Sequence, residues 1–340
     1  AWRPTLDRAR SRYTFQKPLA ERQTQQVRIG RMAADLFAME SLAHLVWRLA
    51  DQHQFDIRIE AAIAKIFSSE ATIRFLKDAQ TLFGGMGYET ADSKRLRGEP
   101  AFGIEQLVRD AEMYRIGEGA TDIMRPFVSR EGLNPHLERA QAYFNEGTTG
   151  SRKVMELLKL ARFYIPWYLR LWKRAQIPLR PEFLDMPVLS HLTLVERLSR
   201  KLARAIYYAM VMKRESLRDD QGRQNRIEMI GEDLLVIASA TLRARREARE
   251  SGRTDVWELV ERITTSANER ITHAIRELIR NRDQEMAESG RHALAGQYDL
   301  LSNGVVQRSL NDYLPKTMTS SGPVSLRSNV SSVEDSPGLH

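Results

Sequence analysis

The chain has 340 residues, a formal net charge of +8 and no cysteine. That length suggests about two domains with ample room for a hydrophobic core. The lack of cysteine excludes disulfides, thiolate metal sites and a cysteine nucleophile. The positive charge favours anionic partners, whether membrane surfaces, nucleotides or nucleic acid. No apolar run approaches the roughly 20 residues of a membrane span, and the first residues contain no apolar signal region.

Helical periodicity dominates the first 135 residues, and strand signals are almost absent. Four helices are expected in order, over residues 19–50, 57–82, 93–114 and from just after 119 to about 132. The second ends at the glycines of FGGMGY, and Gly98 and Pro100 interrupt the third. This pattern predicts an all-α fold that begins with an antiparallel helix bundle.

The second half of the chain changes in character. Aromatic and aliphatic residues alternate with cations in residues 151–180, and helical periodicity then returns in strongly charged segments. The end of the chain is rich in serine, glycine and proline, which is typical of disorder. We therefore divide the chain into a helical domain, a linker with a basic amphipathic segment, a second helical domain and a disordered tail, over residues 1–135, 136–190, 191–315 and 316–340.

One carboxylate, Glu118, stands between Gly117 and Gly119 with helical sequence on both sides. Two glycines in that place cost helix stability, up to roughly 1 kcal/mol each. The triplet alone is typical of an acid in a surface turn, or near a helix start. It is also what a positioned catalytic carboxylate would need, because glycine lets a substrate approach the backbone closely.

Three ordered motifs resolve this choice: RYTFQKPLAERQ, DAQTLFGGMGY and LVRDAEMYRIGEGATDIMR. In this order and at these separations they resemble the C-terminal helical domain of the acyl-CoA dehydrogenases, over roughly residues 5–135. The long extension and the segment TDIMRPFV are most similar to the very-long-chain branch. The resemblance implies that fold: the family's C-terminal helical bundle, followed by a second helical extension domain.

By this resemblance Glu118 is the base that removes the α-proton of an acyl-CoA thioester, while the β-hydrogen leaves as a hydride to flavin N5. The N–H of the same glutamate would help to stabilise the thioester oxygen as it gains charge. Gly119 and Arg130 match positions near the substrate and its CoA part. The cofactor implied is FAD. Its contacts would come from Arg12, Thr14, Phe15, Thr81, Leu82, Phe83, Gly84, Gly85, Ala120 and Asp122, with Arg12 reaching the pyrophosphate of the neighbouring subunit.

Three departures from the family pattern weaken expected flavin contacts. Gln16 stands in place of glycine after Phe15, Thr81 in place of glutamine before the glycine loop, and Ala120 in place of the threonine after the base. Each removes or shifts a polar contact, at roughly 0.5–1.5 kcal/mol. The family's two preceding domains are also absent from this sequence. We therefore expect either a fragment of a longer polypeptide or a truncated relative.

The resemblance implies the α,β-dehydrogenation of long-chain acyl-CoA in fatty-acid β-oxidation, by a homodimer that passes electrons to an electron-transfer flavoprotein. The alternative is a non-catalytic helical scaffold or assembly factor derived from the same family. The three departures and the missing domains favour the scaffold, whereas the intact Glu118 favours the enzyme. The aromatics form no stacking platform and the histidines have no metal spacing, so we expect neither a nucleic-acid partner nor a metal.

Residues 151–180 place tryptophan and tyrosine beside lysine and arginine, with Glu156 as the single acid. This composition is typical of a helix that lies in a membrane interface, and Pro166 would kink it or split it into two short helices. A helix packed on the protein body with its basic face in water is the alternative. The resemblance favours the membrane: the mitochondrial inner membrane on its matrix side, or the cytoplasmic face of a bacterial inner membrane.

Overall fold

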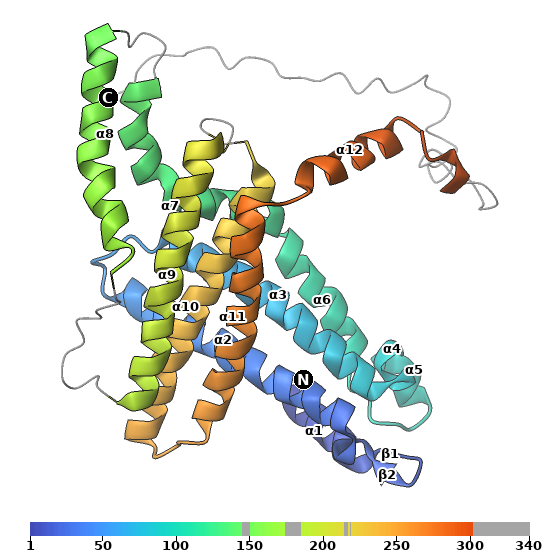
Figure 1. Cartoon of the computed structure of the whole chain (residues 1–340). Helices are drawn as coiled ribbons and strands as arrows, with labels where there is room; N and C mark the ends of the chain where they lie inside the picture. The colour runs from blue at the N-terminus through green and yellow to red at the C-terminus, as the bar shows by residue number, and fades with distance from the viewer. Residues whose placement is uncertain (145–149, 174–184, 214–216, 218, 302–340) are drawn as a thin grey trace, which may run out of the picture. The chain divides into compact units, whose positions relative to one another are not determined.

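The computed structural model describes residues 1–144, 150–173, 185–213, 217 and 219–301 (Figure 1). The first part contains helices and one hairpin: α1 (Trp2–Ser11), β1 (Tyr13–Thr14), β2 (Lys17–Pro18), η1 (Leu19–Glu21), α2 (Gln23–Asp51), α3 (Arg58–Phe83), α4 (Gly85–Tyr88), α5 (Ala91–Leu96), α6 (Ile104–Ile116) and α7 (Thr121–Phe144). Further helices follow: α8 (Gly150–Arg170), α9 (Met186–Lys213), α10 (Gln221–Glu250), α11 (Val256–Ile279), α12 (Asp283–Leu294) and η4 (Asp299–Leu301). The expected all-α fold is confirmed.

The helices end at residues that interrupt the helical pattern of apolar residues in the sequence. Helix α3 stops at Gly84, whose φ of 62° is the left-handed conformation that glycine adopts without strain. The Gly84 N–H donates to the carbonyls of Gln80 and Thr81 at 3.1 Å each. The expected interruption near Gly98 is also present, since α5 ends at Leu96 and α6 begins only at Ile104.

Two helices run further than expected. Helix α7 continues past Gly132 and Pro135 to Phe144, and α8 continues through Pro166 to Arg170. The expected split of α8 into two short helices is therefore wrong. A proline removes one backbone donor, and the remaining bonds of a helix can carry it across that gap. The Pro166 carbonyl also accepts a bond from Arg170 Nε at 3.3 Å.

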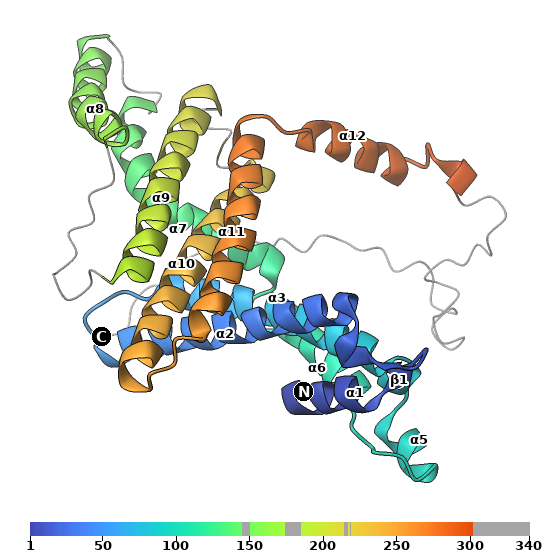
Figure 2. The ribbon, with the colours of Figure 1, turned by 60° about the horizontal axis from the view of Figure 1, so that its bottom comes forward.

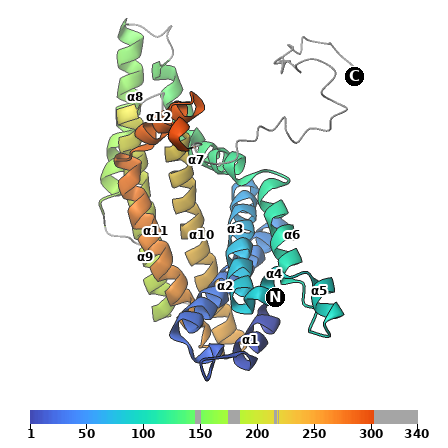
Figure 3. The same ribbon diagram turned by 90° about the vertical axis from the view of Figure 1, so that its right-hand side faces the viewer.

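Helices α2 and α3 pack side by side, and the group of α9, α10 and α11 crosses them (Figures 2 and 3). One apolar core spans this crossing. Phe37 of α2 and Ile66 of α3 belong to it, as do Val236 of α10 and Val260 of α11. A second core is formed mainly by residues of α9, α10 and α11, and a third joins α1 and α2 to α3 and α6.

Contacts divide the chain into two compact units, residues 1–281 and 282–340. The second unit contains α12 and η4, which have no buried residues. The domain division expected from the sequence stays a prediction, and its disordered tail lies outside the described residues. So do residues 174–180 of the basic segment. None of the helices in the described ranges is both long and apolar enough to cross a bilayer.

Candidate functional site

Glu118 lies in a tight loop between α6 and α7. Its φ is 51°, and Gly119 follows with a φ of 93°. A left-handed conformation at a residue with a Cβ costs roughly 1–2 kcal/mol, and such residues gather at functional sites. A Cβ at position 119 would lie 2.9 Å from Met124 Sδ and would also be strained by the positive φ, so the position favours glycine. The loop therefore presents an exposed carboxylate on a strained backbone.

Contacts from two elements hold this loop. Lys65 of α3 donates from Nζ to the Gly119 carbonyl. The Ala120 carbonyl accepts the N–H groups of Ile123 and Met124 at 2.9 Å each, which ties the loop to the first turn of α7. Among the described residues no acceptor takes the Glu118 N–H, so this donor is available to a ligand.

Ala120 stands in place of the expected threonine, and the neighbouring Thr121 does not compensate for it. The Thr121 hydroxyl is buried and has no hydrogen-bond partner within the described part of the chain. Asp122 is exposed in the first turn of α7, and Arg130 is exposed further along the same helix. Ala120 thus shares the loop with Glu118, and Asp122 and Arg130 lie on the helix that follows this loop.

A second feature is a cavity of about 750 Å³ at the end of α1. It is lined by the hairpin, the α3–α4 junction and the segment after α4. Seven of the expected FAD positions line it: Arg12, Thr14 and residues 81–85. Phe15 and the Glu118 loop do not line it. The lining residues are Arg8, Arg12, Thr14, Leu19, Thr81, Leu82, Phe83, Gly84, Gly85, Met86, Glu89, Arg97, Glu99 and Pro100.

The charges of this cavity suit an anion. Arg8 lies in the last turn of α1, and Arg12 is the extended residue that directly follows this helix. Burial, and then the charge of Arg12, lower the pKa of Arg8, whose Nε is buried without a partner among the described residues. An anion beside both guanidinium groups would relieve this repulsion and supply the missing acceptor.

Glycines open the other wall of the cavity. A Cβ added at Gly84 or Gly85 would meet no atom within 4 Å, so their backbone faces open space. A flat or anionic group can therefore approach the chain closely at this point. The phosphates and adenosine of a dinucleotide fit this combination of a glycine wall and arginines. Leu82 and Phe83 contribute to the same wall while their side chains remain in the core.

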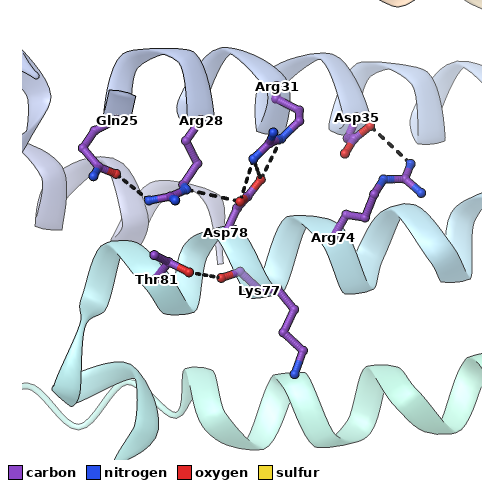
Figure 4. Close-up of polar contacts among 8 residues, drawn as sticks. All are labelled: Gln25, Arg28, Arg31, Asp35, Arg74, Lys77, Asp78 and Thr81. Atoms are coloured by element: carbon purple, nitrogen blue, oxygen red, sulfur yellow. Dashed lines mark hydrogen bonds and ion pairs between the residues drawn. The ribbon is translucent and has the colours of Figure 1, made fainter. Parts of the chain in front are cut away.

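Thr81 lines the cavity, but its hydroxyl is already engaged. It donates to the Lys77 carbonyl at 2.8 Å, along its own helix (Figure 4). A threonine here therefore does not replace the polar contact of a longer amide side chain. The loss of a flavin contact at this position stays a prediction.

The hairpin before η1 turns at Phe15 and Gln16, with φ values of 50° and 64°. Two left-handed residues are what the tightest hairpin turn requires, and glycine or asparagine usually supplies them. Phe15 is 93% exposed, and the Arg22 guanidinium lies 5.7 Å from its ring centre. Arg22 Nε also donates to Thr14 Oγ1 at 3.0 Å, which fixes the hairpin beside the cavity.

Sequence reasoning missed several residues at these sites. Arg8 could have been found from its helical spacing to Arg12. No local signal pointed to Lys65, which reaches the Gly119 carbonyl from a distant part of the chain. Arg97 also lines the cavity, where it pairs with Glu89 and Glu99.

Comparison with known proteins decides the family. A family profile described as "Acyl-CoA dehydrogenase, C-terminal domain" matches residues 1–133. The probable acyl-CoA dehydrogenase FadE10 of Mycobacterium tuberculosis is 34% identical over 302 residues, covering 88% of this chain and 46% of the relative. Residues 1–133 are a C-terminal domain of the acyl-CoA dehydrogenase family. The chain spans about half the length of the curated relatives that it matches most fully.

Other members of the family match over shorter spans or with lower identity. The very-long-chain specific acyl-CoA dehydrogenase of Bos taurus is 36% identical over 127 residues, 37% of this chain and 18% of that protein. A crystal structure of an acyl-CoA dehydrogenase complexed with FAD from Bacillus anthracis matches with a TM-score of 0.60 and 19% identity. It covers 85% of this chain and 48% of that one, which shows a shared fold beyond the profile match.

Proposed function

We propose that this chain is the C-terminal part of an FAD-dependent acyl-CoA dehydrogenase that introduces the α,β double bond of long-chain acyl-CoA in fatty-acid β-oxidation. The observation that carries the proposal is Glu118, an exposed carboxylate on a left-handed loop at the position of the family's base. The strained backbone costs stability, and non-glycine residues in this conformation cluster at functional sites.

The chemistry assigned to this chain is a proton transfer. The Glu118 carboxylate takes the α-proton of the thioester, and its own N–H stabilises the thioester oxygen as negative charge develops. Gly119 has no side chain, so a flat acyl group can lie against the loop. The bound flavin supplies the acceptor for the hydride that leaves the β-carbon. The Lys65 contact holds the loop in place while the proton moves.

The cavity at α1 is proposed to hold the phosphates and adenosine of FAD. Arg8 and Arg12 would neutralise the phosphates, and the backbone of Gly84 and Gly85 would face the nucleotide. In the family, this flavin comes from the neighbouring subunit. We therefore propose a homodimer in which the cavity of one copy serves the active site of the other, with electron transfer to an electron-transfer flavoprotein.

Purification of the full-length gene product tests this proposal. We expect flavin absorbance that bleaches when long-chain acyl-CoA is added without air. Glu118→Gln should keep the flavin absorbance and lose the bleaching, because the amide cannot accept the α-proton. A colourless wild-type protein would support the non-catalytic scaffold instead, whereas equal bleaching by the variant would show that Glu118 is not the base. That alternative draws on Ala120 and on the engaged hydroxyl of Thr81.

We further propose that α8 binds an anionic membrane surface. One side of this helix packs on the protein, where the ring centres of Tyr168 and Tyr207 lie 5.0 Å apart and Tyr164 contacts His136. A neighbouring side of the helix carries exposed apolar residues at helical spacing, beside exposed cations. The apolar residues are Val154, Leu158, Ile165 and Leu169, and the cations are Arg152, Lys159, Arg162 and Arg170.

This arrangement supports the interfacial reading over a basic face in water, because an apolar stripe about half exposed is costly in solution. The proposed location is the matrix side of the mitochondrial inner membrane or the cytoplasmic face of a bacterial one. Flotation with anionic vesicles tests it. Ile165→Glu and Leu169→Glu should lower the floated fraction, whereas Ser151→Glu, which adds the same charge at an exposed polar site, should lower it less. Equal flotation of all variants would exclude α8 as the contact.

A further inference from the structure

A cluster of buried charges joins α7 to α10. Arg125 of α7 donates to Glu228 of α10 and lies 3.6 Å from Glu232, one turn further along α10. The side-chain exposures of these residues are 14%, 0% and 13%. Buried charges of this kind are costly unless they are paired, so the guanidinium and the carboxylates hold one another in place.

Groups from every neighbouring helix complete the cluster. Asp233 of α10 accepts from Arg270 of α11 at 3.1 Å, and Asp35 of α2 lies 3.5 Å from Arg74 of α3. Burial raises the pKa of each carboxyl group, and the arginines oppose that rise. The charged groups that face one another are Asp35, Arg74, Arg125, Glu228, Glu232, Asp233 and Arg270. The carboxyl groups outnumber the arginines by one, which favours a retained proton in the cluster.

Arg125 is also close to the Glu118 loop along the chain. The residue before it, Met124, packs its sulfur against Gly119 and donates its N–H to the Ala120 carbonyl. The residue after it is Pro126, which has no N–H to donate to the first turn of α7. The side-chain tie from Arg125 to α10 therefore stabilises the helix at the place where a backbone bond is missing.

We propose that Arg125, with Glu228 and Glu232, is a positioning residue for Glu118. It ties the start of α7, and so the loop, to the extension helix α10. The inference rests on the proposed function, because that function makes Glu118 a base whose position matters. Proton transfer requires the carboxylate within a fraction of an ångström of its productive place, and misplacement by 1 Å costs about 100-fold in rate. The extension thereby contributes to catalysis without touching substrate.

The chain offers a matched control in Arg243. This arginine also ties α10 to the N-terminal bundle, through Glu40 of α2 at 2.7 Å and the Phe37 ring at 4.6 Å. Its side chain is 16% exposed, against 14% for Arg125. Arg243→Gln thus removes a tie that a similarly shielded arginine makes to the same helix, away from α7, with a partner carboxylate that is 49% exposed.

Hydrogen exchange of the full-length protein tests the inference without relying on activity. The probes are the hydrogen-bonded N–H groups of Gly117, Ile123 and Met124. We expect exchange about tenfold faster or more in Arg125→Gln, an intermediate change in Arg125→Lys, and the wild-type rate in Arg243→Gln. If Arg125→Gln does not fold, Arg125→Lys against Arg243→Gln decides. Unchanged exchange in the Arg125 variants, or equal acceleration in the control, would overturn the proposal.

Kinetics give a second readout. In Arg125→Lys the rate of flavin bleaching at saturating acyl-CoA should fall about tenfold, with a smaller change in KM. An equal loss in Arg243→Gln would show a general structural effect and overturn the proposal. A wild-type protein that never bleaches its flavin would contradict the proposed function. The exchange result at the loop would still decide whether Arg125 positions it.

Discussion

Glu118 and Glu232 show how two glutamates of one chain acquire different tasks. Glu118 is exposed on a left-handed loop that follows α6. Glu232 is largely shielded on α10 among other carboxyl groups, where burial and then the charge of Glu228 raise its pKa to about 8. Arg125 opposes this rise. The first environment suits a base that meets a ligand, and the second suits a group that retains its proton near neutral pH.

The buried carboxyl group predicts a pH dependence of stability. Because the folded protein has the higher pKa, it binds more protons than the unfolded chain between about pH 4.5 and pH 8. The free energy of unfolding should therefore fall as the pH rises through this range. Glu232→Gln, which cannot ionise, should flatten the slope and add about 1–3 kcal/mol at pH 8.5.

Urea unfolding at pH 5.5 and pH 8.5 measures this effect. Glu250→Gln is the control, because Glu250 is exposed on the same helix. The control should keep the wild-type slope between the two pH values. A Glu232→Gln protein whose stability still falls as steeply as that of the wild type would show that Glu232 does not retain its proton.

At the level of single residues, the sequence indicates the candidate site positions but not the contacts that hold them. The three motifs identified Glu118, Arg12 and the glycine pair, because each lies within a short, ordered pattern. The Lys65 contact to the Gly119 carbonyl was not predictable in this way. Neither was the pairing of Arg125 with Glu228, because both depend on helix packing between residues far apart in the chain.

Helices α2 and α3 are joined by ion pairs as well as by their apolar core. The Asp78 carboxylate of α3 accepts two hydrogen bonds from the Arg31 guanidinium, at 2.8 and 3.0 Å. Arg28 Nε lies 3.2 Å from the same carboxylate (Figure 4). The Asp78 side chain is only 16% exposed. A carboxylate that is shielded and shared between two arginines contributes more than an exposed pair does.

Asp78→Asn should therefore lower the free energy of unfolding by about 1–2 kcal/mol, since both arginines lose their charged acceptor. Thermal or urea unfolding measures the loss. Asp56→Asn is the control, because Asp56 and its partner Arg58 are both mostly exposed, and it should change stability little. An equal effect of the two substitutions would contradict the importance of the shielded pair.

At the level of elements, periodicity predicted most helices, and the errors came from reading Gly132 as a helix end and Pro166 as a possible break. The ends of α3 and the break before α6 followed from Gly84, Gly98 and Pro100. The lengths of α7 and α8 did not, because the structure carries both helices across internal prolines. Tertiary packing decides whether a helix tolerates a missing donor, and a single sequence does not contain that information.

The N-terminal bundle and the extension are joined by a common core. Phe37 and Ile66 of the bundle lie in one cluster with Val236 and Val260 of the extension. This contact was not predictable from the sequence, since the two segments are far apart in the chain. Burial of these side chains contributes roughly 1.5–3 kcal/mol each, so each part depends on the other for stability.

A chain that ends after residue 144 tests this dependence. It should expose the cluster, bind the dye ANS and unfold without a cooperative transition, although it contains the whole profile match to residue 133. Calorimetry and dye fluorescence measure both properties against the 340-residue chain. A shortened protein that unfolds cooperatively at the same temperature would show that the bundle does not need the extension.

The central claim concerns one proton, and a substrate analogue isolates its transfer. An acyl-CoA with sulfur in place of the β-carbon has no β-hydrogen to lose, so only the α-proton can leave. In deuterated water the full-length protein should exchange that hydrogen, as mass spectrometry of the recovered thioester would show. Glu118→Gln should slow the exchange by about 10²–10⁴-fold, the usual contribution of a general base. Exchange at the wild-type rate in this variant would contradict the account.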